Sequence, residues 1–95
     1  MPESERLAGY RAEIDACDGE LVQLLARRFA VTEKVGKLKA RGGLPAADPA
    51  REAEQRDRIH ALAIESGLDP RLAESVWRHI VQIVKQRHLD IAQAH

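Results

Sequence analysis

The sequence predicts an all-α fold of three helices, the first of them very long, assembled as an intertwined homodimer. No segment shows the alternation of β-branched and polar residues that is typical of strands, and no Asn-Gly hairpin turn occurs. Apolar residues recur instead at helical spacing through most of the chain. Two Asp-Pro pairs, Asp48-Pro49 and Asp69-Pro70, combine a capping carboxylate with a proline at the first helical position.

The helix boundaries follow from local signals. Gly42, Gly43 and Pro45 break the first helix, and Ser66-Gly67 ends the second. We therefore expect a single domain over residues 1–95 with helices over about residues 4–40, 48–66 and 69–93.

The first helix is too long for its own domain. Roughly 36 residues at 1.5 Å each make a rod of about 54 Å, whereas a compact chain of this length is about 30 Å across. The apolar stripe nevertheless continues along most of it, through Leu7, Tyr10, Ile14, Cys17, Leu21, Leu24, Leu25, Val31, Val35 and Leu38. A second copy of the chain would cover the overhang, with Cys17 as a small hydrophobe within the stripe. The alternative is a solvent-exposed helix with a frayed end.

Composition excludes several classes of function. Acidic and basic residues balance at 15 each, so no overall charge attracts nucleic acid or an anionic membrane. A single cysteine and the absence of an HExxH-like motif argue against a metal site, and three aromatic residues argue against base stacking. Neither a membrane-spanning run nor a signal peptide is apparent, so we expect a cytoplasmic protein.

Two cations of the first helix face the apolar stripe. On a helical wheel Arg28 lies at about 280° and Lys39 at about 300°, near the centre of the stripe. Arg11 lies at its edge, about 25 Å from Arg28 along the axis. One small ligand therefore cannot contact both arginines of a single helix, but in a dimer Arg11 of one chain could approach Arg28 of the other.

The second helix repeats this conflict, because Asp48, Arg51 and Glu52 share a face with apolar residues. Buried charges must be paired with each other, hydrated or paired with a ligand. These charges could pair internally, Arg51 with Asp48 or Gln55 and Lys39 with Glu52. Such pairing would leave an excess of positive charge. Asp48 is also explained as a helix cap. The excess suits a small ligand with more than one carboxylate.

The third helix supplies the rest of the predicted core: Leu72, Val76, Trp77, Ile80, Ile83, Val84 and Ile91. Arg87 falls on that stripe and His88 at its edge. His88 is either an exposed residue favoured by the helix dipole or part of a site. His60 and His79 are expected at the surface, and His95 is terminal.

Together these residues resemble a known family. YRAEIDACDGELVQLLARR, VGKLKA and DPAREAE, followed by a third helix, are similar to the all-helical class of chorismate mutases over about residues 7–90. The resemblance implies a Claisen rearrangement of chorismate to prephenate, on the branch toward phenylalanine and tyrosine, without a cofactor or metal. It also implies a homodimer with two sites, each completed by the partner chain.

The resemblance assigns the cations of the first helix to a catalytic and substrate-binding site. Arg28 and Arg11 of the other chain would clamp the two carboxylates of this dicarboxylate substrate. Lys39 would bind a carboxylate and the ether oxygen, where negative charge grows as the C–O bond breaks. The enzyme would act by conformer selection and by stabilising a polar transition state.

The remaining site residues come from the second and third helices. Glu52 would hold the ring hydroxyl, helped by the region of Asp48, and Arg51 would add charge near the ring carboxylate. His88 stands where the family usually has Gln or Glu as second donor to the ether oxygen, and Val84 where a small hydroxyl residue is frequent. Because an imidazole can change charge near neutrality, His88 predicts pH-dependent activity.

The sequence is also compatible with other functions. The expected fold and pocket also resemble those of isochorismate-pyruvate lyases and 4-amino-4-deoxychorismate mutases. A non-catalytic helical dimer would bind an aromatic-pathway acid, or dock on another shikimate-pathway enzyme and be activated by it. A plain helical dimerisation domain would need no ligand.

Overall fold

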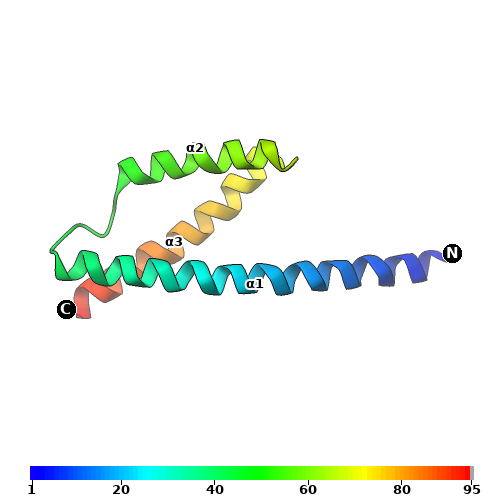
Figure 1. Cartoon of the computed structure of the whole chain (residues 1–95), viewed down its shortest axis with the longest axis horizontal. Helices are drawn as coiled ribbons and strands as arrows, with labels where there is room; N and C mark the ends of the chain where they lie inside the picture. Colours follow the sequence, from blue (N-terminus) through cyan, green and yellow to red (C-terminus); the bar gives the residue numbers. More distant parts are fainter. Residues whose placement is uncertain (95) are drawn as a thin grey trace. The chain divides into compact units, whose positions relative to one another are not determined.

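The computed structural model describes residues 1–94, and His95 lies outside the described residues. Residues 1–94 contain three helices and no strand, which confirms the all-α prediction: α1 (Glu3–Arg41), α2 (Pro49–Glu65) and α3 (Pro70–Ala94) (Figure 1). None of the described helices combines the length and the apolarity that crossing a bilayer requires.

Glycine ends α1 by a local backbone mechanism. The Leu44 amide donates to the Lys39 carbonyl oxygen at 2.8 Å, and the Gly42 amide donates to the Leu38 carbonyl oxygen at 3.0 Å. Gly43 has φ +65°, a left-handed conformation that favours glycine. The carbonyl groups of Leu38 and Lys39 in the last turn are thereby satisfied, and the chain turns toward α2.

Aspartate begins each of the two shorter helices, as the Asp-Pro pairs predict. Asp48 Oδ1 accepts a hydrogen bond from the Arg51 amide at 3.2 Å at the start of α2. Asp69 Oδ1 accepts from the Arg71 amide at 3.0 Å at the start of α3. These carboxylates satisfy backbone donors that have no partner within the helix, and their negative charge interacts favourably with the positive end of the helix dipole.

The chain comprises two compact units, Met1–Val31 and Thr32–His95, and α1 contributes to both. From Glu3 onward the first unit is helical, and it exposes large apolar side chains, among them Leu7, Tyr10, Ile14, Leu21, Val22 and Leu24. Cys17 is exposed as well in the single chain, so its expected packing under a second copy stays a prediction. A single helix cannot bury its own apolar stripe, so these side chains must pack against another segment or chain to leave solvent.

The second unit contains the packed core, where α2 and α3 lie against each other (Figure 1). Ala63 of α2 and Trp77 and Ile91 of α3 are its buried apolar residues. The predicted core of the third helix is wrong for one group of side chains, which are more than half exposed: Leu72, Val76 and Ile83. The apolar surface of α3 is wider than the neighbouring segments of one chain can cover.

Candidate functional site

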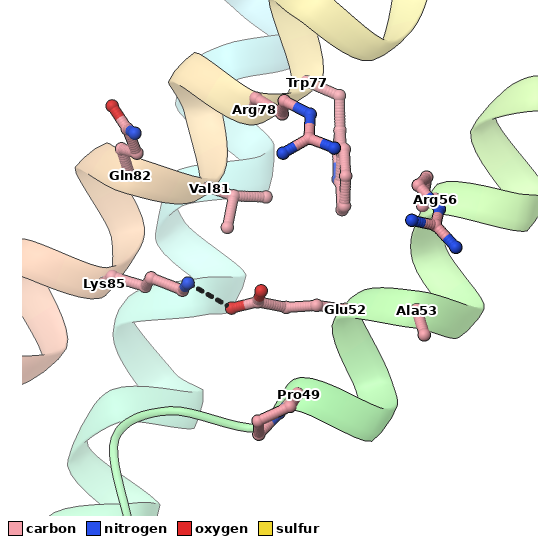
Figure 2. Close-up of a pocket in the computed structure, with 9 residues that line it drawn as sticks. All are labelled: Pro49, Glu52, Ala53, Arg56, Trp77, Arg78, Val81, Gln82 and Lys85. Carbon is pink, nitrogen blue, oxygen red and sulfur yellow. Dashed lines mark ion pairs between the residues drawn. The ribbon is translucent and has the colours of Figure 1, made fainter.

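A cavity of about 270 Å³ lies between α2 and α3. Figure 2 shows the nine side chains that line it: Pro49, Glu52, Ala53, Arg56, Trp77, Arg78, Val81, Gln82 and Lys85. The apolar members come from both helices, and the other groups are charged or polar. A partly apolar lining with a few convergent charges is typical of a site for a small polar molecule.

Glu52 is the only acidic residue that lines this cavity, and it is paired across it. Glu52 Oε1 lies 2.7 Å from Lys85 Nζ, so the ion pair joins α2 to α3 (Figure 2). The alternative in which Lys39 pairs with Glu52 is wrong, because Lys39 Nζ instead donates to the Ala46 carbonyl oxygen at 3.4 Å. Lys39 is half-buried, and its ammonium group has no carboxylate within ion-pair distance in residues 1–94.

A second cluster of ionisable side chains, His60, Glu74 and Arg78, lies beside the cavity, and Arg78 is part of its lining. Arg78 Nε donates to Glu74 Oε2 at 3.2 Å, and His60 Nε2 lies 2.9 Å from Glu74 Oε1. The hydrogen bond from His60, followed by that from Arg78, lowers the pKa of the Glu74 carboxyl. Glu74 therefore holds Arg78 and ties α2 to α3 through His60. Its charge offsets that of Arg78 beside the cavity.

His88 of α3 is buried, with 6 % of its surface exposed. Its Nε2 lies 2.8 Å from the Thr32 carbonyl oxygen of α1, and a Cβ at Gly36 would lie only 2.6 Å from His88 Cδ2. The imidazole therefore packs on the bare backbone of Gly36. The interpretation of His88 as an exposed residue at a helix end is wrong.

The neighbouring Arg87 also contacts α1. Its Nε and Nη2 donate to the two carboxylate oxygens of Glu33, at 2.9 Å and 2.5 Å. This fork lowers the pKa of the Glu33 carboxyl and raises that of the Arg87 guanidinium. Arg87 is more than half exposed and does not join the apolar stripe of α3, because its charge reaches the Glu33 partner at the surface.

The other predicted site residues of α2 and α3 are less enclosed. Arg51 is exposed, and its Nη1 lies 3.4 Å from Glu54 Oε2. Its contact with Asp48 is made by the backbone amide alone, so Asp48 serves as a cap here. Val84 is half-buried.

Arg28 and Arg11 belong to the first unit. Arg28 is half-buried, and its Nη1 atom is buried without a hydrogen-bond partner among the described residues. A buried cationic donor with no partner costs free energy, so a ligand that accepts from it gains affinity. Arg11 is exposed.

Lys85 was not predicted from the sequence as a member of the cavity. A signal for it does exist, since Trp77, Val81 and Lys85 are spaced by four residues and fall on one face of α3. The sequence pattern alone does not show that this face meets Glu52.

Comparison with known proteins decides the family. A model of chorismate mutase type II matches residues 10–89, which is most of the chain. The chain belongs to the chorismate mutase type II family. The matched range includes Arg11, Arg28, Lys39, Glu52 and His88.

Curated relatives agree with this family. The chain is 31% identical over 78 residues to a chorismate mutase of Methanocaldococcus jannaschii, covering 82% of this chain and 79% of that protein. It is 32% identical over 81 residues to a 4-amino-4-deoxychorismate mutase of Streptomyces venezuelae, covering 85% and 79%. The T-protein of Haemophilus influenzae is 37% identical over 78 residues, covering 82% of this chain but only 21% of that protein. The chain thus spans about a fifth of that longer relative and most of the two small ones.

Proposed function

We propose that this chain is a chorismate mutase that rearranges chorismate to prephenate. Family membership over residues 10–89 supports this activity, as does the relative of that name in M. jannaschii. The single observation that carries the proposal is the buried, unpartnered Nη1 of Arg28, since a substrate carboxylate is the group that would satisfy it.

The reaction needs binding and electrostatics from the protein. Within one molecule of chorismate the ether C–O bond breaks while a C–C bond forms, and no proton, electron or external group is exchanged. The enzyme accelerates it by holding the compact conformer in which the two carbons approach. It also stabilises the transition state, in which negative charge grows on the ether oxygen, more strongly than the ground state.

Within this proposal, the cations of α1 act on the carboxylates and on the ether oxygen. Arg28 binds one carboxylate, and Arg11 of a second copy of the chain binds the other. Lys39 binds a carboxylate and the ether oxygen. The absence of a carboxylate partner for Lys39 in residues 1–94 supports its availability for an anionic ligand.

The α2 and α3 residues orient the ring. Glu52 accepts a hydrogen bond from the ring hydroxyl, assisted by the region of Asp48, and Arg51 adds positive charge near the ring carboxylate. His88 acts as second donor toward the ether oxygen, and Val84 packs against the ligand. Glu52 lines the cavity between α2 and α3, which supports its place in a ligand site.

We also infer a homodimer in which the long α1 helices of two chains cover each other's apolar stripes. The exposed Tyr10, Ile14, Leu21 and Leu24 side chains of the first unit support this assembly. A second copy supplies a continuous apolar surface of the same length. It also brings Arg11 to the site of its partner.

A second candidate is the rearrangement of 4-amino-4-deoxychorismate, in which an amino group replaces the ring hydroxyl. The 4-amino-4-deoxychorismate mutase of S. venezuelae is similar to this chain to the same degree as the M. jannaschii chorismate mutase. Overall identity therefore does not separate the two substrates. The residue that contacts the ring substituent must separate them.

The test is turnover by the purified chain, with chorismate and isochorismate supplied separately and the products identified by chromatography. We expect prephenate from chorismate. Arg28→Ala should lower kcat/KM by about a hundredfold or more, because a charged donor to the reacting system is lost. Arg27→Ala, at the exposed neighbouring position, is the matched control and should retain activity.

Two results would overturn the proposal. Pyruvate and salicylate formed from isochorismate, without prephenate from chorismate, would identify a lyase. No turnover of either compound would indicate a binding module, or a chain that another shikimate-pathway enzyme activates by docking.

A further inference from the structure

The ion pair between Glu52 and Lys85 sets the charge at the position that contacts the ring substituent. Lys85 Nζ lies 2.7 Å from Glu52 Oε1, and both side chains are partly exposed, at 44% and 31% of their surface. Figure 2 shows the two groups extending toward each other from α3 and α2 across the cavity. A carboxylate in such a pair already has one cationic donor in place.

The two candidate substrates differ in charge at this position. The ring hydroxyl of chorismate is neutral and donates one hydrogen bond, which the Glu52 carboxylate can accept on its remaining lone pairs while Lys85 is bound. A primary alkylamine carries a proton near neutrality, so the amino analogue presents an ammonium group. That ammonium would compete with the Lys85 ammonium for the Glu52 carboxylate, and the two cations would repel each other.

The rest of the cavity adds no carboxylate that would help an ammonium. Besides Lys85, the lining contains the cations Arg56 and Arg78, and Glu52 is its single acid. The Glu74 carboxylate near Arg78 is already bonded to Arg78 and to His60. An incoming cation therefore meets no acidic group in the lining that lacks a basic partner.

We propose that Lys85 is a specificity-determining residue, which acts through Glu52 to favour a ring hydroxyl over a ring ammonium. This inference rests on the proposed mutase function and on Glu52 contacting the ring substituent. Lys85 is a positioning residue here, because it holds and neutralises the group that contacts the substrate. It selects chorismate over 4-amino-4-deoxychorismate.

The experiment measures kcat/KM for chorismate and for 4-amino-4-deoxychorismate with wild type, Lys85→Met and Lys85→Arg. We expect wild type to prefer chorismate. Lys85→Met keeps the length of the side chain and removes its charge, so it should shift the ratio of the two kcat/KM values toward the amino substrate by about fivefold, the effect of one partly exposed charge pair. Lys85→Arg keeps the charge and should keep the wild-type ratio.

Lys34→Met is the matched control, because Lys34 is an exposed lysine of α1 outside the cavity, and its ratio should equal that of wild type. A ratio in Lys85→Met equal to that of wild type, with chorismate still converted, would overturn the inference and leave the mutase function standing. An equal shift in Lys34→Met would also overturn it, since the effect would then be a general one of charge. No turnover of either substrate by wild type would overturn the mutase function itself, and the inference with it.

Discussion

His88 Nε2 lies 2.8 Å from the carbonyl oxygen of Thr32, and this contact joins α3 to α1. A carbonyl oxygen only accepts hydrogen bonds, so Nε2 must carry the hydrogen. In the neutral ring Nδ1 then carries a lone pair and cannot donate. His88 can therefore hold Thr32 and donate to a substrate at the same time only as the imidazolium.

The proposed role of His88 as second donor is tested by removing the ring. We expect His88→Ala to lower kcat/KM for chorismate, because it removes the donor, whereas His88→Gln carries an amide that can donate and should keep more of the activity. Initial rates with chorismate measure this difference, and a His88→Ala variant as active as wild type would contradict the donor role.

Gly36 provides the space in which His88 lies. In Gly36→Ala the new Cβ would lie 2.6 Å from His88 Cδ2 and 2.9 Å from Ile91 Cδ1, both in buried side chains. Overpacking costs about 1–3 kcal/mol, against a gain of about 1 kcal/mol from replacing glycine within a helix. We expect the free energy of unfolding to be lower by up to about 2 kcal/mol, in denaturant titrations at one fixed protein concentration.

Gly19→Ala is the matched control for this prediction. A Cβ at Gly19 meets no atom within 4 Å, and on the helical wheel the residue lies opposite the apolar stripe of α1. This variant should be more stable than wild type by about 0.5–1 kcal/mol. If both alanine variants were stabilised equally, His88 would not be packed against Gly36.

Local chemistry explains why the helices could be predicted and why the site could be predicted only in part. Gly43 ends α1, and Asp48 and Asp69 begin the next helices, through backbone conformation and hydrogen bonds within a few residues. The partner of Glu52 depends instead on how α2 and α3 pack, and sequence spacing offered Lys39 where the structure has Lys85.

Burial is the other property that local pattern does not determine. His88 looks like a polar residue at a helix end, yet it is buried because a residue without a side chain, Gly36, lies opposite it on another helix. Conversely Leu72 and Val76 continue an apolar pattern and remain exposed. Periodicity identifies a face, whereas burial requires knowing what covers that face.

The fork between Arg87 and Glu33 predicts a stability effect at acid pH. The Arg87 hydrogen bond lowers the pKa of Glu33 in the folded state below its unfolded value of 4.5. The contribution is therefore complete above the unfolded pKa and is lost as pH falls through the folded one. Wild type should exceed Glu33→Gln in thermal midpoint at pH 7, and the difference should shrink as pH falls below about 4.5.

Glu54→Gln, which removes the exposed carboxylate beside Arg51, is the comparison for this measurement. Its pair is at the surface and within one helix, so its midpoint should differ little from that of wild type at either pH. A difference between wild type and Glu33→Gln that stayed constant down to pH 3 would exclude the ion pair as its cause.

The inferred exchange of Arg11 between chains predicts that two inactive variants restore each other. Arg11→Ala and Arg28→Ala should each lose about a hundredfold or more in kcat/KM, because each removes one carboxylate contact from every site. When the two variants are unfolded together in equal amounts and refolded, half of the dimers pair one chain of each kind. Such a dimer has one site with an intact Arg28 and an intact Arg11 of the partner chain.

Counting sites fixes the expected recovery. The other site of the mixed dimer lacks both arginines, so about a quarter of the wild-type activity should return when the chains pair at random. If Arg11 acted on the site of its own chain, every site in every dimer would lack one arginine, and mixing would restore nothing.

Refolding each variant alone under the same conditions is the control, and the assay is the initial rate of chorismate consumption at equal total chain concentration. A mixture no more active than its separate components would therefore contradict the supply of Arg11 by a second chain, and sedimentation of the same samples would show whether dimers had formed at all.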